Sequence, residues 1–183
     1  MAAPRLETER LILRTWRDDD RAPFAEMNAD PLVMEHFPAT LSRAESDAMV
    51  DRINAVFAQR GFGLWAVQVV GGASFVGFVG LLVPTFEAHF TPCVEVGWRL
   101  ARAHQGLGYA TEAARAAVRF GFQVLGLEEI VSMTVPRNVK SRHVMEKLGM
   151  TRRAADDFDH PRLPEGHPLR RHVLYRLRRQ RSV

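Results

Sequence analysis

Cysteine is nearly absent from the sequence, because Cys93 is the only one among 183 residues. A single thiol cannot close an internal disulfide or build a multi-cysteine metal site, and its isolation agrees with a reducing compartment. The seven histidines form no compact metal motif, since His160, His167 and His172 are spaced loosely along a proline-rich segment. We therefore expect no bound metal ion.

Long hydrophobic runs are also missing. The longest apolar stretch covers residues 75–83, well short of the ~20 residues that a membrane-spanning helix needs. The N-terminus carries Arg5, Glu7, Glu9 and Arg10 where a signal peptide would have its apolar core. These absences predict a cytoplasmic protein with no membrane partner.

The composition is that of a folded domain, with 46% hydrophobic and 25% charged residues. A chain of this length without repeats or linkers is expected to form one domain over residues 1–183. The net charge of +4 is uneven: residues 137–183 hold 13 of the 25 Lys and Arg residues and 5 of the 21 acidic residues, which gives +8 against −4 for the remainder.

A basic C-terminal part is compatible with nucleic-acid binding, but its arginines interleave with apolar residues. This spacing is typical of the solvent face of a final strand; the residues are Arg170, Arg171, Arg176, Arg178, Arg179 and Arg181, with Val173, Leu174 and Leu177. The sequence also lacks regularly placed aromatic residues and a helix-turn-helix pattern. We therefore prefer solvated surface to a nucleic-acid-binding module.

The local patterns predict a mixed sheet flanked by helices, an α+β or α/β fold. Strands are expected at residues 10–14, 64–70, 75–83, 94–100, 130–135 and 173–177, with Gly71-Gly72 turning a hairpin. Four helices are expected. The first has an acidic cap within residues 18–20 and ends near residue 28, and the second begins at the capping box of Ser42 and Glu45. The third covers the alanine-rich residues 110–125 and the fourth residues 138–148.

A glycine-containing stretch, residues 105–110, joins the strand at 94–100 to the alanine-rich helix. Glycines at a helix N-terminus leave backbone N–H groups free to hold a phosphate, although an ordinary strand-to-helix turn has the same pattern. A dinucleotide fingerprint fits poorly because Thr111 occupies its third glycine position, and a nucleotide-hydrolase loop fails because Gly-Lys-Ser/Thr is absent. The stretch therefore favours another anionic cofactor.

Three motifs resemble the GNAT superfamily of acetyl-coenzyme A-dependent N-acetyltransferases. Gln105-x-x-Gly108-x-Ala110 matches its cofactor motif, and residues 94–98 resemble the strand that carries this motif. Asn138-x-x-Ser141 followed by residues 146–150 is similar to the RimJ/RimL-like branch. The resemblance extends from Leu6 to Leu177.

The resemblance implies a mostly antiparallel sheet that is splayed open at its middle, with the pantetheine arm of acetyl-CoA between the two halves. It implies that backbone N–H groups bind the pyrophosphate; the residues are Gln105, Gly106, Leu107, Gly108, Tyr109 and Ala110. It also implies that Asn138 binds the pantetheine arm and that Ser141 approaches the sulfur as a proton donor, although many family members have a tyrosine there. A helix N-cap explains the same Asn-x-x-Ser spacing in purely structural terms.

Direct acetyl transfer to an amine requires removal of a proton from the amine and stabilisation of an oxyanion. Glu95 is our candidate base, directly or through a water, because it lies between Val94 and Val96 on the expected central strand, where burial raises a carboxyl pKa. The family places functional carboxylates on this strand. The alternative is a surface-facing glutamate, and Cys93, which shares its face, is expected to pack.

The acceptor by resemblance is a protein N-terminus or a small amine, and a homodimer stays open. We expect the acceptor side to use residues 34–37 and 156–168, where Asp156, Asp157 and Asp159 would attract a cationic amine. Several aromatic residues either line this cleft or belong to the core: Trp16, Phe37, Trp65, Phe86 and Phe90. A non-catalytic acyl-CoA sensor is the alternative function.

Overall fold

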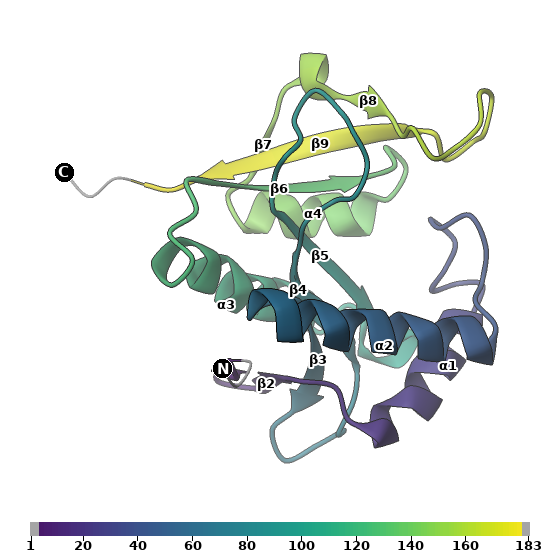
Figure 1. The fold of residues 1–183 in the computed structure, drawn as a ribbon, viewed down its shortest axis with the longest axis vertical. Helices are drawn as coiled ribbons and strands as arrows, with labels where there is room; N and C mark the ends of the chain where they lie inside the picture. The colour runs from purple at the N-terminus through teal and green to yellow at the C-terminus, as the bar shows by residue number, and fades with distance from the viewer. Residues whose placement is uncertain (1–3, 181–183) are drawn as a thin grey trace.

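The fold is built on a nine-stranded sheet in a computed structural model that describes residues 4–180 (Figure 1). Its strand order is β1-β2-β3-β4-β5-β6-β9-β7, with β8 paired to β9 outside this path. The strands are β1 (Leu6–Glu7), β2 (Leu11–Arg14), β3 (Leu64–Val69), β4 (Gly77–Leu82), β5 (Glu95–Leu100), β6 (Glu129–Thr134), β7 (Thr151–Arg152), β8 (Phe158–Asp159) and β9 (Arg171–Arg178). Every pairing is antiparallel except that of β5 with β6.

The parallel pair β5–β6 is joined at one end only. Glu95 opposite Val131 is the single residue pair between the two strands, and the Val131 N–H donates to the Val94 carbonyl at 2.9 Å. The flanking pairs β4–β5 and β6–β9 each extend over six residues. Figure 1 shows β5 running obliquely away from β6. The predicted opening at the middle of the sheet is thus confirmed.

Helices cover both faces of the sheet: α1 (Arg21–Ala29), α2 (Arg43–Arg60), α3 (Tyr109–Gln123) and α4 (Val139–Lys147). Phe24 of α1 packs edge-to-face on Phe78 of β4, whereas a Cβ at Gly121 of α3 would lie 3.2 Å from Leu81. Residues 78 and 81 point to opposite faces of a strand. Helices α1 and α3 therefore lie on opposite sides of the sheet.

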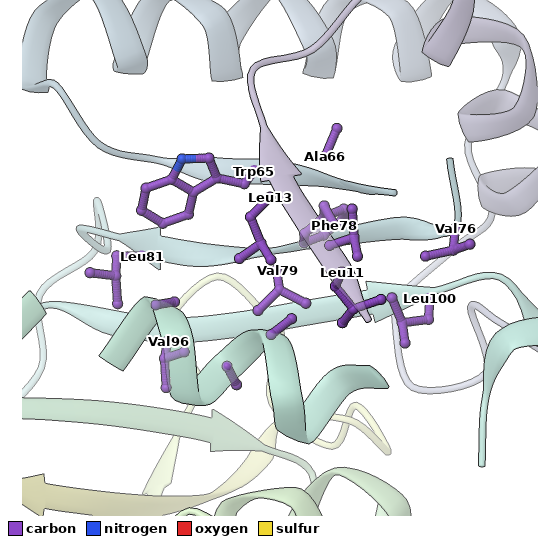
Figure 2. Packing of buried hydrophobic residues seen from close by; sticks show 14 of the residues in the cluster. Leu11, Leu13, Trp65, Ala66, Val76, Phe78, Val79, Leu81, Val96 and Leu100 are labelled. Carbon is purple, nitrogen blue, oxygen red and sulfur yellow. The ribbon is translucent and has the colours of Figure 1, made fainter. Parts of the chain in front are cut away.

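The main core includes a layer between the sheet and α3. Figure 2 shows side chains of β2 to β5, among them Leu11, Trp65, Val79 and Val96, gathered in this layer. The facing side of α3 consists of small residues such as Ala113, Ala114 and Ala117, which are fully buried, so the helix lies close to the strands. This confirms the small-residue face predicted from the sequence.

The predicted capping box and hairpin are confirmed, whereas one predicted helix cap is not. The capping box is present, since Ser42 accepts from the Glu45 backbone and Glu45 from that of Ser42, and β3 and β4 form the expected hairpin. The acidic cap of the first helix is wrong. Asp20 ends a short 3₁₀ turn (Asp18–Asp20) and stands at the N-cap position of α1, but its side chain makes no capping bond to that helix. Its carboxylate instead accepts from the buried Arg14 at 2.7 and 2.8 Å and from the Arg17 N–H at 2.7 Å.

The basic C-terminal part is balanced by carboxylates. Arg176 pairs with Glu129 and Asp156, and most of its neighbours are also paired; the further pairs are Arg170 and Arg171 with Asp159, Arg178 with Glu129, and Arg179 with Glu128. Arg181, also assigned to this surface, lies outside the described residues. Within residues 4–180, no helix has both the length and the apolar character to cross a membrane.

Candidate active site

The opening between β5 and β6 is accessible to groups from two faces of the sheet. Side chains alternate along β5, so Glu95, Gly97 and Arg99 point to the side of α1, and Val96, Trp98 and Leu100 to the side of α3. Backbone groups alternate likewise, so the Trp98 N–H points to the same edge as the Val94 carbonyl, into the opening. At the opening, β5 therefore offers side chains on both faces of the sheet and the backbone N–H of Trp98 at its edge.

The glycine stretch forms a cradle of free backbone donors at the N-terminus of α3. Gly106 and Gly108 have φ of 78° and 84°, the left-handed region that glycine adopts without strain. Within the described residues, no acceptor takes a hydrogen bond from the backbone N–H groups of residues 106–111. The first intrahelical bond is donated by the Glu112 N–H to the Gly108 carbonyl at 3.0 Å. These donors, together with the helix dipole, suit a phosphate.

Arg10 adds a cation beside this cradle, although no local sequence motif assigns it to the site. Its Nη1 donates to the Leu107 carbonyl at 3.1 Å, its guanidinium lies 5.0 Å from the centroid of the Tyr109 ring, and its Nε donates to Glu112 at 2.7 Å. Burial acts to raise the pKa of Glu112, but hydrogen bonds from Thr8 and Arg10 hold it below its usual range. The ionised Glu112 therefore orients Arg10 against the loop.

The surroundings of the cradle are basic. A cavity of about 420 Å³ beside Gly108 is lined by three basic residues, Arg10, Arg115 and Lys147, and by two acidic ones, Glu9 and Glu112. On the other side, Lys140 donates to the Gln105 side chain at 3.4 Å, and Gln105 Nε2 donates to the Leu100 carbonyl at 3.0 Å. The Gln105 side chain thus ties the loop to the end of β5, and its surroundings suit an anion.

Asn138 and Ser141 lie across the opening from β5. Asn138 is the N-cap of α4, since its side chain accepts from the Ser141 N–H at 3.2 Å, and its amide donates to Thr134 at the end of β6 at 2.9 Å. Ser141 Oγ accepts from Trp98 Nε1 at 3.3 Å. Because the oxygen is the acceptor in that bond, the hydroxyl proton of Ser141 is free to be donated elsewhere. The structure thus brings Ser141 against the α3-side face of β5.

Glu95 lies at the junction where β5 and β6 part. It is half-buried, and burial raises the pKa of its carboxyl to about 8, although a hydrogen bond that the carboxylate accepts from the Met133 backbone acts to lower it. A carboxyl with this pKa exchanges its proton near neutral pH, as a general base requires. Burial also raises the pKa of the neighbouring Cys93 thiol to about 11, so Cys93 stays protonated, and it packs against the cluster formed by Phe90, Val131, Phe158 and Leu174.

The aromatic residues assigned to the cleft divide into two groups. Trp16, Trp65 and Phe90 are buried core residues. Phe37 is 38% exposed, and Phe86 is half-buried beside His160, with ring centroids 4.6 Å apart. Burial is the main reason that the pKa values of His160 and His172 are lowered. Neither imidazole therefore places a positive charge beside the acceptor at neutral pH.

The acidic residues assigned to the acceptor side are all engaged in ion pairs. Asp156 pairs with Arg176 at 3.1 Å, Asp157 with Arg152, and Asp159 with Arg170 and Arg171. The hydrogen bond from Arg152 is the main reason that the pKa of Asp157 is lowered. Arginines of the same chain neutralise these carboxylates, so they do not attract a cationic amine.

The chain is similar in sequence to known acetyltransferases. The model of the acetyltransferase (GNAT) domain family matches residues 10–151. The FsC-acetyl coenzyme A-N(2)-transacetylase of Aspergillus fumigatus is 34% identical over 157 residues, which cover 82% of this chain and 66% of that protein.

Solved structures share the fold. An acetyltransferase of the GNAT family from Bacillus anthracis superposes with a TM-score of 0.79 at 24% identity, covering 96% of this chain and 98% of that chain. The spermidine N-acetyltransferase from Vibrio cholerae, solved in complex with CoA and spermine, superposes with a TM-score of 0.72 at 18% identity, covering 93% of this chain and 96% of that chain. The mixed sheet with flanking helices is therefore the arrangement that these enzymes share.

Proposed function

The chain belongs to the acetyltransferase (GNAT) domain family, and we propose that it moves an acetyl group from acetyl-CoA to a primary amine by direct transfer in a ternary complex. The observation that carries the proposal is the opening between β5 and β6, with a phosphate cradle on one side and the high-pKa Glu95 on the other. Two reactants can thus approach the same strand from opposite faces.

The residues present fit acetyl-CoA, which when bound supplies an activated acetyl thioester. Backbone N–H groups along Gln105, Gly106, Leu107, Gly108, Tyr109 and Ala110 would hold its pyrophosphate, since those of residues 106–110 have no partner within the described chain. Asn138 and Ser141 would hold the pantetheine arm along the free edge of β5. The small-residue loop leaves room for this approach, because a Cβ at Gly106 meets no atom within 4 Å.

The chain's own groups account for the proton movements of the transfer. Glu95 takes a proton from the attacking amine, directly or through a water, as the new C–N bond forms. The Trp98 N–H, directed into the opening, stabilises the negative charge on the carbonyl oxygen. The C–S bond then breaks, and Ser141 or a water hydrogen-bonded to it returns a proton to the thiolate. Trp98 Nε1 supports this last role by occupying an acceptor position of the serine oxygen.

The finer assignments form part of the same proposal. We place the chain in the RimJ/RimL-like branch on its Asn138-x-x-Ser141 motif, as one domain over residues 1–183 that acts in the cytoplasm. The acceptor is a small amine or a protein N-terminus. The acetyl-CoA donor is supported by a relative whose name includes acetyl coenzyme A and by a structural neighbour solved with CoA.

The test is release of free thiol from acetyl-CoA in the presence of a panel of amines, amino acids and N-terminal peptides, followed with a thiol-reactive chromophore. At least one acceptor is expected to raise thiol release above the rate without enzyme, and mass spectrometry should find it heavier by one acetyl group. A protein that binds acetyl-CoA but releases thiol with none of these acceptors would be an acyl-CoA sensor instead.

A further inference from the structure

Arg99 is a buried cation without an anionic partner on the acceptor side of β5. It is 9% exposed and lies opposite Phe78 of β4, on the same strand face as Glu95 and Gly97. Its Nη1 donates to Asn28 Oδ1 of α1 at 2.6 Å. Within residues 4–180, no carboxylate lies within 4.0 Å of its guanidinium, and Nε is shielded from solvent without an acceptor. Burying a guanidinium in this way is unfavourable unless a group outside the chain completes its partners.

The contrast with Arg14 shows that the fold neutralises a buried arginine elsewhere. Arg14 is 5% exposed, and both of its Nη atoms bond the Asp20 carboxylate, at 2.7 and 2.8 Å. Its remaining donors bond Gln68 and two backbone carbonyls. Arg99 has only a neutral amide. Burial lowers its pKa to about 10, so Arg99 keeps its charge at neutral pH.

Two aromatic rings pack on the Arg99 guanidinium but accept no hydrogen bond from its N–H groups. Its carbon lies 4.1 Å from the ring centroid of Phe37 and 5.4 Å from that of Phe78. These cation–π contacts stabilise the charge, but a ring face accepts none of the in-plane N–H groups. Phe37 belongs to the segment after α1 and is 38% exposed, so the guanidinium lies just beneath the surface of the acceptor side.

We infer that Arg99 binds a carboxylate of the acceptor, so that the substrate is an amine that carries a carboxylate at its other end. A planar carboxylate can accept two parallel hydrogen bonds from the guanidinium, and it supplies the negative charge that Arg99 lacks as a partner within the chain. The inference rests on the proposed acetyl transfer, because it identifies the far end of the acceptor. With a rise of about 3.3 Å per residue, the Cα atoms of Glu95 and Arg99 are about 13 Å apart along β5. An acceptor can therefore place its amine near Glu95 and its carboxylate near Arg99.

The test measures binding independently of turnover. N-Acetylglycine, 4-acetamidobutyrate and 6-acetamidohexanoate, the acetylated forms of amino acids with three spacer lengths, are titrated into the protein with CoA by calorimetry. Each is compared with its carboxamide, which has the same shape without the charge. At least one carboxylate is expected to bind about 10- to 100-fold more tightly than its amide.

The variants assign that preference to Arg99. Arg99→Met should reduce the preference to less than about twofold and leave amide binding unchanged, while Arg99→Lys should retain part of it because the charge stays but the planar fork is lost. Arg52→Met, on the exposed part of α2, is the matched control and should keep the full preference. Removing an unpaired buried charge is not expected to unfold the protein, which the melting temperature of Arg99→Met checks.

Two results would overturn the inference. One is equal binding of every carboxylate and its amide by the wild-type protein, and the other is a preference that survives in Arg99→Met. If only the proposed function fails, the result is different. Carboxylates then bind preferentially through Arg99, but no amine promotes thiol release from acetyl-CoA.

Discussion

Replacing Glu95 with glutamine should raise the stability of the protein in a pH-dependent way. The folded protein holds the Glu95 pKa at about 8, whereas the ordinary value is 4.5. Below pH 4.5 the carboxyl is protonated in both the folded and the unfolded chain and does not favour either. Between pH 4.5 and 8 the unfolded chain releases a proton that the folded chain retains, so the wild-type free energy of unfolding falls as pH rises.

The size of the effect follows from the two pKa values. At pH 7 the difference amounts to about 3 kcal/mol in the free energy of unfolding, and at pH 5 to about 1 kcal/mol. Glutamine has no such proton, so Glu95→Gln should gain about 2 kcal/mol relative to wild type between pH 5 and pH 7. The slope against pH is the diagnostic quantity, because any change in hydrogen bonding adds a constant offset.

The assay is urea unfolding of both proteins at pH 5, 6, 7 and 8. Glu26→Gln, on the exposed face of α1, controls for the substitution itself. Parallel stability curves for wild type and Glu95→Gln would refute the raised pKa and the burial that causes it.

Turnover tests the catalytic role of the same carboxyl. Wild-type kcat should rise with pH through a midpoint near 8, since only ionised Glu95 accepts a proton. Glu95→Gln should lower kcat at pH 7 by about 10²- to 10⁴-fold with little change in acetyl-CoA affinity, and the loss should shrink at higher pH, where more of the amine is unprotonated. Near-normal turnover of the variant at pH 7 would exclude Glu95 as the base.

Three further substitutions test the other parts of the structure. Gly108→Val should abolish the rise in melting temperature caused by acetyl-CoA, whereas Gly126→Val, at a φ of 67° with no atom within 4 Å, should carry the same backbone strain and keep the rise. Asp20→Ala should cost about 3–5 kcal/mol in urea unfolding, because it leaves the buried Arg14 unpaired; a loss below about 1 kcal/mol would contradict that pairing. Asp157→Asn should lower the melting temperature and leave the KM for the acceptor unchanged, since its carboxylate is engaged by an arginine; an increased KM would return this residue to the acceptor site.

The motifs between near neighbours in the chain were predictable because their geometry is local. The capping box of Ser42 and Glu45 and the N-cap of Asn138 each depend on a side chain reaching a backbone group three residues away. Gly106 and Gly108 adopt the left-handed conformation that glycine permits without strain. The small-residue face of α3 follows from helical periodicity, and the opening in the sheet followed from the resemblance of three motifs to one family.

The electrostatics of the site could not be predicted in this way, because they depend on contacts between distant segments. An acidic residue within 18–20 was expected to cap a helix, yet a buried arginine from β2 engages the Asp20 carboxylate. Asp157 reads as a free acidic residue in a polar segment, but the fold places it beside Arg152. Arg10 reaches the glycine loop 97 residues away. In each case the competing partner is absent from the local pattern.

The sequence by itself determined the four helices, six of the nine strands, including the one that carries Glu95, and the glycine turn before α3, since short-range backbone preferences and side-chain periodicity specify these. Only the tertiary structure decided how each charge is compensated. Folding places Glu95 where loss of solvent raises its pKa to about 8, and gives Arg14 a carboxylate. It gives Arg99 an amide and two aromatic rings. The cost of a buried charge depends on every group packed around it, and those groups come from segments that only the fold brings together.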